Sequence, residues 1–233
     1  MTNAFHAVFY WLVTRSLRCL LTVGAGVTRV DFAPLPEDAF VLASNHISHF
    51  DPPFLSGWIT RKIDWIAMAE LFGTSWSRAA FGWLDVIPVD RSGGDRQSLR
   101  TALARLAHGR IVGVFPEGGI RDGSRSMLMG GPFREGAVLL SARSGRPLVP
   151  VAILGSERLY NKRNWLPWRR ARVYIAVGAP IFPDPDLSGS AARDALRTAL
   201  AEAIVELRGN LVEHCGLVEN DLPHSPQERM SEP

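Results

Sequence analysis

Short apolar runs alternate with stretches of helical periodicity along most of the chain. The runs are rich in β-branched residues and predict buried strands at 39–44, 63–68, 86–89, 111–115, 148–154 and 173–177. Between them, apolar residues at the spacing of one helix face predict helices near 52–59, 69–80, 97–108, 133–143 and 191–213. This alternation is typical of an α/β fold, and we predict a largely parallel central sheet flanked by helices.

The N-terminal residues 1–30 follow a different pattern. A long apolar run, 5–27, is interrupted midway by Arg15, Ser16 and Arg18, so it contains no clean span of about 20 apolar residues. No Lys or Arg precedes the run, unlike the basic start of a secretory signal peptide. We expect an apolar, membrane-associating helical segment that lies in the interface with its arginines at the headgroups. The alternative is an ordinary core-packing helix with two exposed arginines.

The rest of the chain divides into one domain and a short tail. Residues 31–215 hold all the predicted strands and suit a single domain in a chain of 233 residues. From 216 to 233 the sequence is polar, contains proline and has little apolar surface to bury. We therefore predict that 216–233 is a disordered polar tail.

Charge and cysteine content narrow the class of function. The formal net charge is +3 and the isoelectric point is about 9.2, which suits an anionic membrane surface or anionic substrates. No nucleic-acid-binding motif accompanies this charge, so we expect no nucleic-acid partner. The two cysteines, Cys19 and Cys215, lie far apart and form neither a disulfide framework nor a metal-binding pair.

A cluster of polar side chains follows the first strand of the predicted domain. Within seven residues it comprises Asn45, His46, Ser48, His49 and Asp51. In an open α/β sheet, groups just beyond the carboxyl end of a strand line the usual ligand crevice. Asp51 precedes two prolines, a pattern that predicts an N-cap for a helix starting near residue 52.

Three interpretations of this cluster are open. In the first, Asp51 caps a helix and the histidines are polar residues of a surface loop. In the second, Asp51 fixes the tautomer of His46, whose other ring nitrogen then acts as a general base. In the third, His46, His49 and Asp51 bind a metal ion. The spacing differs from the His-Glu-x-x-His pattern and no further His/Cys cluster follows, so we expect no metal site.

Three more segments complete a set of motifs. Residues 82–91 are Gly-Trp-Leu-Asp-Val-Ile-Pro-Val-Asp-Arg, residues 114–118 are Val-Phe-Pro-Glu-Gly, and residues 149–153 are Val-Pro-Val-Ala-Ile. With Asn45-His46-x-x-x-x-Asp51 ahead of them, they resemble in order the four motifs of the glycerolipid acyltransferases. That family contains the lysophosphatidate and glycerol-3-phosphate acyltransferases, and the resemblance covers roughly residues 38–180.

The resemblance implies a role for each motif residue. His46 would be the base and Asp51 its partner. Arg91 would contact the phosphate of the acceptor, for which a guanidinium offers a matching fork of donors. The remaining substrate-binding residues would be Glu117, Gly118, Arg121, Asn45 and Ser48. One position departs from the family, because Ile120 stands where an arginine is common and Arg121 is the neighbouring candidate.

The resemblance also implies an activity. We expect transfer of a fatty acyl group from acyl-CoA or acyl-carrier protein to the free hydroxyl of a lysophospholipid, with 1-acyl-glycerol-3-phosphate favoured, in phospholipid biosynthesis. No cofactor is expected. The location implied is the cytoplasmic face of a membrane, the bacterial inner membrane in particular, with peripheral or monotopic attachment. The alternatives are a metal-dependent hydrolase using His46, His49 and Asp51, and a non-catalytic lipid-binding protein on the same scaffold.

A basic, aromatic segment follows the fourth motif. Residues 156–172 hold six basic residues against one acidic, interleaved with Tyr160, Trp165 and Trp168. Basic residues attract anionic lipid headgroups, and indole rings favour the headgroup level of a membrane. We expect membrane contact here. The alternatives are docking of coenzyme A phosphates or an acidic carrier protein, and a solvated hairpin without a ligand.

Overall fold

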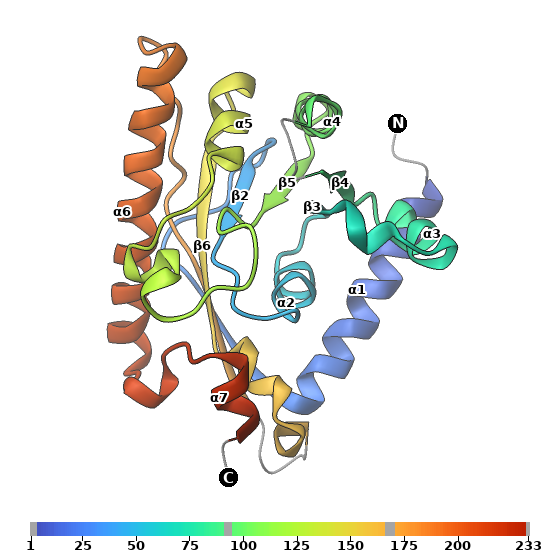
Figure 1. Cartoon of the computed structure of the whole chain (residues 1–233), viewed down its shortest axis with the longest axis vertical. Helices are drawn as coiled ribbons and strands as arrows, with labels where there is room; N and C mark the ends of the chain where they lie inside the picture. Colours follow the sequence, from blue (N-terminus) through green and yellow to red (C-terminus); the bar gives the residue numbers. More distant parts are fainter. Residues whose placement is uncertain (1–3, 91–94, 166–170, 232–233) are drawn as a thin grey trace.

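A seven-stranded sheet of order β1-β7-β6-β2-β5-β3-β4 forms the centre of the protein (Figure 1). It is seen in a computed structural model that describes residues 4–90, 95–165 and 171–231. The strands are β1 (Ala25–Asp31), β2 (Val41–Ser44), β3 (Ile63–Met68), β4 (Ile87–Val89), β5 (Ile111–Val114), β6 (Leu148–Leu154) and β7 (Ala171–Val177). The predicted α/β fold with a mostly parallel central sheet is confirmed.

Strand direction determines where a site can form. The neighbours β6, β2, β5, β3 and β4 all run parallel, whereas β7 pairs antiparallel with β6 and parallel with β1. Because adjacent parallel strands end at the same edge of a sheet, the loops after β2, β5 and β6 meet there. These loops begin at Asn45, Phe115 and Gly155.

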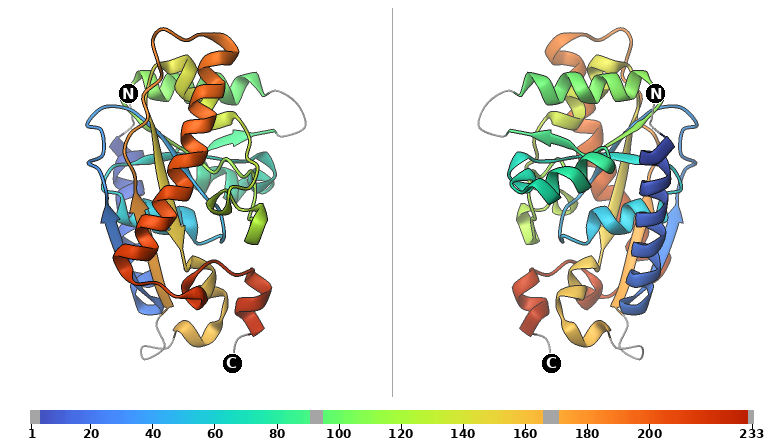
Figure 2. Two further views of the ribbon diagram at one scale, coloured as in Figure 1. Left: turned by 90° about the vertical axis from the view of Figure 1, so that its left-hand side faces the viewer. Right: turned by 90° about the vertical axis from the view of Figure 1, so that its right-hand side faces the viewer.

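Helices cover both faces of the sheet, with α6 across one face and α1 across the other (Figure 2). The helices are α1 (Ala4–Gly24), α2 (Asp51–Trp58), α3 (Ser75–Trp83), α4 (Arg96–Ala107), α5 (Gly136–Ser144), α6 (Gly189–Cys215) and α7 (Pro226–Ser231). Side chains of β2 alternate between two apolar clusters, as the pleat of a strand requires. Val41 and Ala43 join α4, α5 and α6, while Leu42 joins α1 and α2.

The N-terminal segment is helical as expected, but its end is not. α1 packs against α2 and α3, and no helix in the described part of the chain is long and apolar enough to cross a membrane. The helical segment expected over 1–30 ends at Gly24, because Ala25–Asp31 forms strand β1. Valines at positions 27 and 30 favour a strand locally, and parallel pairing with β7 secures it at the edge of the sheet.

The C-terminal residues also differ from the expectation of a disordered tail. They contain a 3-10 turn, η6 (Glu219–Asp221), and the helix α7. Asp221 Oδ1 accepts a hydrogen bond from Arg158 Nη2 at 3.2 Å, and α7 packs against the 3-10 helix η4 (Ser156–Tyr160). An ion pair and the surface of η4 therefore order a segment that is poor in apolar residues.

Gly113 of β5 allows two neighbouring side chains to pack on the sheet. A Cβ at this position would lie 2.6 Å from atoms of both Ile63 and Trp65. We expect Gly113→Ala to destabilise the fold by about 1–3 kcal/mol through overpacking, measured by urea unfolding. Gly209→Ala is the matched control, because open space surrounds Gly209 on α6 and alanine should there gain up to about 1 kcal/mol of helix propensity. Equal stability of the two variants would contradict this packing argument.

Candidate active site

His46 and Asp51 form a hydrogen-bonded pair in the connection between β2 and α2. The Nδ1 atom of His46 lies 2.8 Å from Oδ2 of Asp51. The Asp51 side chain is fully buried, whereas 17% of the His46 side chain is exposed. A carboxylate on Nδ1 fixes the ring with Nε2 as the free proton acceptor. The pair therefore has the arrangement of a general base and its orienting carboxylate.

Asp51 organises the loop rather than capping the helix. Its Oδ2 accepts hydrogen bonds from the backbone N–H groups of Ile47 and Ser48, at 2.8 and 2.9 Å. The predicted N-cap is wrong, because α2 begins at Asp51 itself and its N-cap residue, Phe50, makes no side-chain cap. The carboxylate folds back onto its own loop, where it meets three donors, the His46 ring included.

A further residue contacts Asp51 from the segment that follows β6. The hydroxyl of Ser156 donates a hydrogen bond to Asp51 Oδ1, and Ser156 is fully buried just beyond the end of β6. None of the four sequence motifs contains Ser156. Its position after a strand that neighbours β2 is the signal that could have found it, because parallel strands end at one edge.

Removal of the Ser156 hydroxyl is expected to loosen the His46–Asp51 pair. Ser156→Ala leaves one oxygen of a buried carboxylate without this donor, which costs about 1–3 kcal/mol of stability. The less firmly held Asp51 should lower kcat by about tenfold or less, since the His46 contact itself remains. Steady-state kinetics together with thermal unfolding measure both effects, and wild-type values for both would contradict the role.

Two aromatic rings support the imidazole from one side. The ring of Phe115 stacks on His46 with centroids 4.2 Å apart and an interplanar angle of 24°. Trp65 in turn stacks on Phe115, with ring centroids 4.7 Å apart and the two rings almost parallel at 7°. Stacked aromatic rings hold a defined geometry, so the His46 ring plane is set by side chains that follow β5 and belong to β3.

Glu117 contacts the backbone of His46. Its Oε2 accepts a hydrogen bond from the backbone N–H of His46 at 2.6 Å. Its Oε1 accepts hydrogen bonds from Ser126 Oγ at 2.8 Å and from the backbone N–H of Met127 at 2.7 Å. The side chain is only 3% exposed, and this burial raises the pKa of Glu117 to about 7 although the hydrogen bonds act in the opposite direction.

Residues 27–154, more than half of the chain, match the family model described as Acyltransferase. This chain belongs to the acyltransferase family. The predicted resemblance to the glycerolipid acyltransferases is thereby confirmed, and the protein is an O-acyltransferase.

Similar proteins share this family. The 1-acyl-sn-glycerol-3-phosphate acyltransferase of Bacillus subtilis is 28% identical over 210 residues, which cover 87% of this chain and 98% of that protein. The 1-acyl-sn-glycerol-3-phosphate acyltransferase alpha of mouse is 30% identical over 149 residues, 63% of this chain and 51% of the mouse protein. The crystal structure of the 1-acyl-sn-glycerophosphate (LPA) acyltransferase from Thermotoga maritima has the same fold, with a TM-score of 0.62 at 20% identity, over 85% of this chain and 81% of that one.

Two residues expected to bind substrate lie inside the loop of this acyltransferase. Asn45 is fully buried and bridges to β6, donating from Nδ2 to the Ile153 carbonyl at 2.9 Å and accepting from the Ile153 N–H at 2.8 Å. Ser48 is also fully buried, and its hydroxyl accepts a hydrogen bond from Phe50 N at 3.0 Å. Both side chains therefore shape the His46 loop instead of facing an open surface.

Two further predicted residues border the third motif, and one cannot be placed. Arg121 lies beside the His46 loop, because its backbone N–H donates to the His46 carbonyl at 2.8 Å. Gly118 has φ +69°, and a Cβ there would lie 2.7 Å from Nε of Arg134, whose side chain covers the turn. Arg91 falls outside the described residues. The acyltransferase thus brings Arg121 next to His46 and Gly118 next to Arg134, which was not among the predicted site residues.

His49 pairs with Tyr160 and not with His46 and Asp51, the two residues that would share a metal ion with it. Its Nδ1 lies 2.5 Å from the Tyr160 hydroxyl, and its backbone N–H donates to the same oxygen at 3.1 Å. Within the described ranges, no three His, Cys, Asp or Glu side chains are grouped so that they could hold a metal ion. The geometry of this acyltransferase therefore favours the base interpretation of His46 and Asp51.

Proposed function

We propose that this acyltransferase moves a fatty acyl group from an acyl thioester to the free hydroxyl of 1-acyl-glycerol-3-phosphate, as a step of phospholipid biosynthesis. The main observation in support is the His46–Asp51 pair, in which the orienting carboxylate is buried while the imidazole is partly exposed. The Bacillus subtilis and mouse relatives are named 1-acyl-sn-glycerol-3-phosphate acyltransferases, which supports this choice of acceptor. Either acyl-CoA or acyl-carrier protein can supply the thioester.

The reaction steps follow from where the His46–Asp51 pair can take up and return a proton. His46 Nε2 takes the proton of the acceptor hydroxyl while the hydroxyl oxygen attacks the thioester carbonyl. Asp51 remains ionised and stabilises the imidazolium that forms. When the tetrahedral intermediate collapses, the thiolate leaves and receives the proton from His46, which restores the base. These steps need no cofactor.

Arginines beside the catalytic loop are suited to the acceptor phosphate. The Arg121 side chain lies near Gly119 and that of Arg134 near Gly118, so both guanidinium groups border the same turn. In the part of the chain that the structure describes, neither forms an ion pair with a carboxylate. Guanidinium forks match phosphate oxygens, and we propose that this turn receives the phosphate, with Arg91 as a further candidate.

A substrate panel tests the proposed function. The purified protein is incubated with palmitoyl-CoA or palmitoyl-carrier protein and with lysophosphatidate, lysophosphatidylcholine or glycerol 3-phosphate, and the products are identified by mass spectrometry. We expect phosphatidate from lysophosphatidate with at least one donor. The phosphate of lysophosphatidylcholine carries choline as a second ester and is not terminal. Equal turnover of that acceptor would therefore contradict recognition of a terminal phosphate. Absence of phosphatidate with both donors would overturn the proposal.

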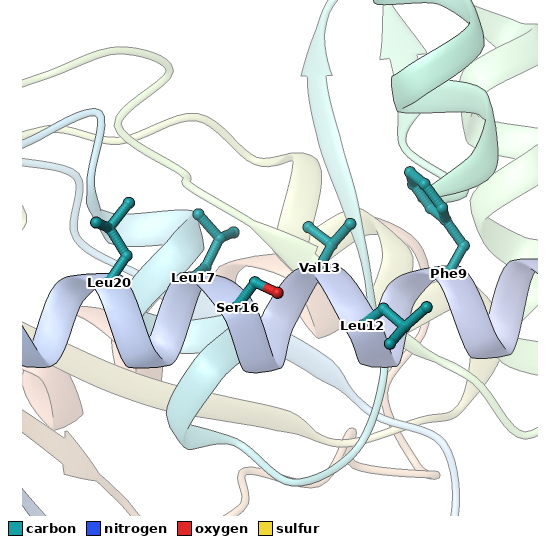
Figure 3. A pocket seen from close by; sticks show the side chains of 6 residues that line it. All are labelled: Phe9, Leu12, Val13, Ser16, Leu17 and Leu20. Carbon is teal, nitrogen blue, oxygen red and sulfur yellow. The ribbon is translucent and has the colours of Figure 1, made fainter.

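We further propose that the protein works on the cytoplasmic face of a bacterial inner membrane, with α1 lying on the bilayer. An apolar groove runs along one side of α1, and its lining side chains are shown in Figure 3: Phe9, Leu12, Val13, Ser16, Leu17 and Leu20. Trp83 of α3 extends this surface, because its ring lies 5.2 Å from that of Phe9. Exposed apolar surface of this extent suits an interface with lipid.

Charge substitutions on α1 test this membrane contact. Leu12 and Leu20 are 51% and 54% exposed, so Leu12→Glu combined with Leu20→Glu should leave the fold intact. We expect binding to phosphatidylglycerol-containing vesicles to fall at least about tenfold in a flotation assay, because each leucine loses its burial in lipid. The matched control places the same charges elsewhere, at the exposed Leu187 and Val205. A loss of binding in the control alone would assign the membrane contact to a different surface.

A further inference from the structure

Glu117 contacts the backbone N–H of the catalytic histidine and not its imidazole ring. The carboxylate is 3% exposed, which leaves almost none of its surface for a lipid hydroxyl. Three donors already surround its two oxygens, from His46, Ser126 and Met127. The family resemblance implies contact between this glutamate and the acceptor. The burial of Glu117 and its hydrogen bonds favour a role in holding the loop instead.

The three donors connect the His46 loop to the apolar core. Ser126 is the N-cap of the 3-10 helix η3 (Met127–Met129), and its hydroxyl accepts a hydrogen bond from Leu128 N at 3.3 Å. Met127 and Leu128 are each 1% exposed and belong to the apolar cluster under α6. One side of the Glu117 carboxylate is therefore fixed to packed residues, while the other side holds the backbone of His46.

The backbone of His46 is restrained at both its N–H and its carbonyl group. Glu117 accepts from its N–H at 2.6 Å, and the Arg121 N–H donates to its carbonyl at 2.8 Å. With Asp51 on the ring, the backbone and the side chain of His46 are held by groups that come from different loops. Placement of a catalytic group to within a fraction of an ångström has large effects on rate.

We infer that Glu117 is a positioning residue that holds the His46 backbone, and that it is not a ligand of the acceptor. This inference rests on the proposed function only in that His46 is the base of acyl transfer. Loss of the contact should change the turnover number, while acceptor affinity should stay constant, because the acceptor does not reach the buried carboxylate. A ligand role would have the opposite signature, with weaker acceptor binding.

Glu117→Gln is the first test. An amide has one acceptor oxygen, so whichever way it points, its NH2 group faces the N–H of either His46 or Met127. We expect kcat to fall about 10-fold to 100-fold and KM for the acceptor to stay within about twofold. Glu202→Gln, an exposed position on α6, is the matched control with unchanged kinetics. A raised acceptor KM with unchanged kcat would overturn the inference.

A second variant and a direct readout cover the case in which Glu117→Gln does not fold. Glu117→Asp keeps the charge but is one methylene shorter, so it cannot span from His46 N to Met127 N, and the same loss of kcat is expected. In ¹H–¹⁵N NMR spectra of the folded variant, the amide proton of His46 should shift upfield as its carboxylate partner withdraws. An unmoved His46 resonance would contradict positioning.

The NMR measurement needs no substrate, so it separates this inference from the proposed function. If wild-type protein acylates an acceptor other than lysophosphatidate, the proposed acceptor is wrong but the Glu117 variants can still be measured with the acceptor that is used. If lysophosphatidate is acylated and the Glu117 variants change only KM, the proposed function stands and the positioning role is wrong.

Discussion

Replacement of His46 with alanine is expected to lower kcat for acyl transfer by about 10²–10⁴-fold, the usual contribution of a general base. Without the His46 imidazole, the base that Asp51 orients is missing when the thioester is attacked, because His49 pairs with Tyr160 instead. The fold should remain intact, because Asp51 keeps its hydrogen bonds from the Ile47 and Ser48 backbone and from Ser156. Release of free thiol from the donor, followed with a chromogenic reagent, measures the rate.

Two other histidines serve as controls for this result. His108 is exposed at the end of α4, and His108→Ala should leave kcat unchanged. His49→Ala addresses the metal interpretation, in which His49 is a ligand beside His46. Because His49 turns to Tyr160, we expect its removal to have a much smaller effect than that of His46. Equal losses from His46→Ala and His49→Ala would revive a shared metal site, and near-normal activity of His46→Ala would refute the base assignment.

The second large effect is expected from Asp51→Asn. Asp51 is fully buried and accepts from two backbone N–H groups, the Ser156 hydroxyl and the His46 ring. An asparagine has only one acceptor oxygen, so its amide NH2 group faces donors and can also impose the wrong tautomer on His46. We expect kcat to fall about 10²-fold or more, together with a loss of about 1–3 kcal/mol of stability from the disrupted buried contacts.

Kinetics and urea unfolding on the same preparation separate the two consequences of Asp51→Asn. Asp194→Asn on the exposed side of α6 is the matched control and should change neither quantity. A variant that loses stability but keeps its kcat would show that Asp51 only shapes the loop. That outcome would support the surface-loop interpretation, in which the carboxylate has no part in catalysis.

Local pattern was sufficient for most of the fold. Five of the parallel strands and the helices between them follow from short apolar runs and helical spacing, because each run needs burial on both faces of a sheet. Errors occurred where local signals compete. The helix expected over 69–80 is divided into η1 (Ala69–Phe72) and α3, since Thr74 caps α3 by accepting from Ser77 N at 3.0 Å. β1 was missed because its partner, β7, lies at the other end of the chain.

The sequence by itself determined the fold class and the order of the motifs, and it singled out His46 and Asp51 as the candidate pair. Only the tertiary structure decided what surrounds them. Asp51 meets Ser156 across 105 residues, and Glu117 meets the His46 N–H across 71 residues. These contacts arise because β2, β5 and β6 are neighbours that end at one edge of the sheet. Strand order depends on packing over the whole domain, whereas local residue types constrain only contacts that are close along the chain.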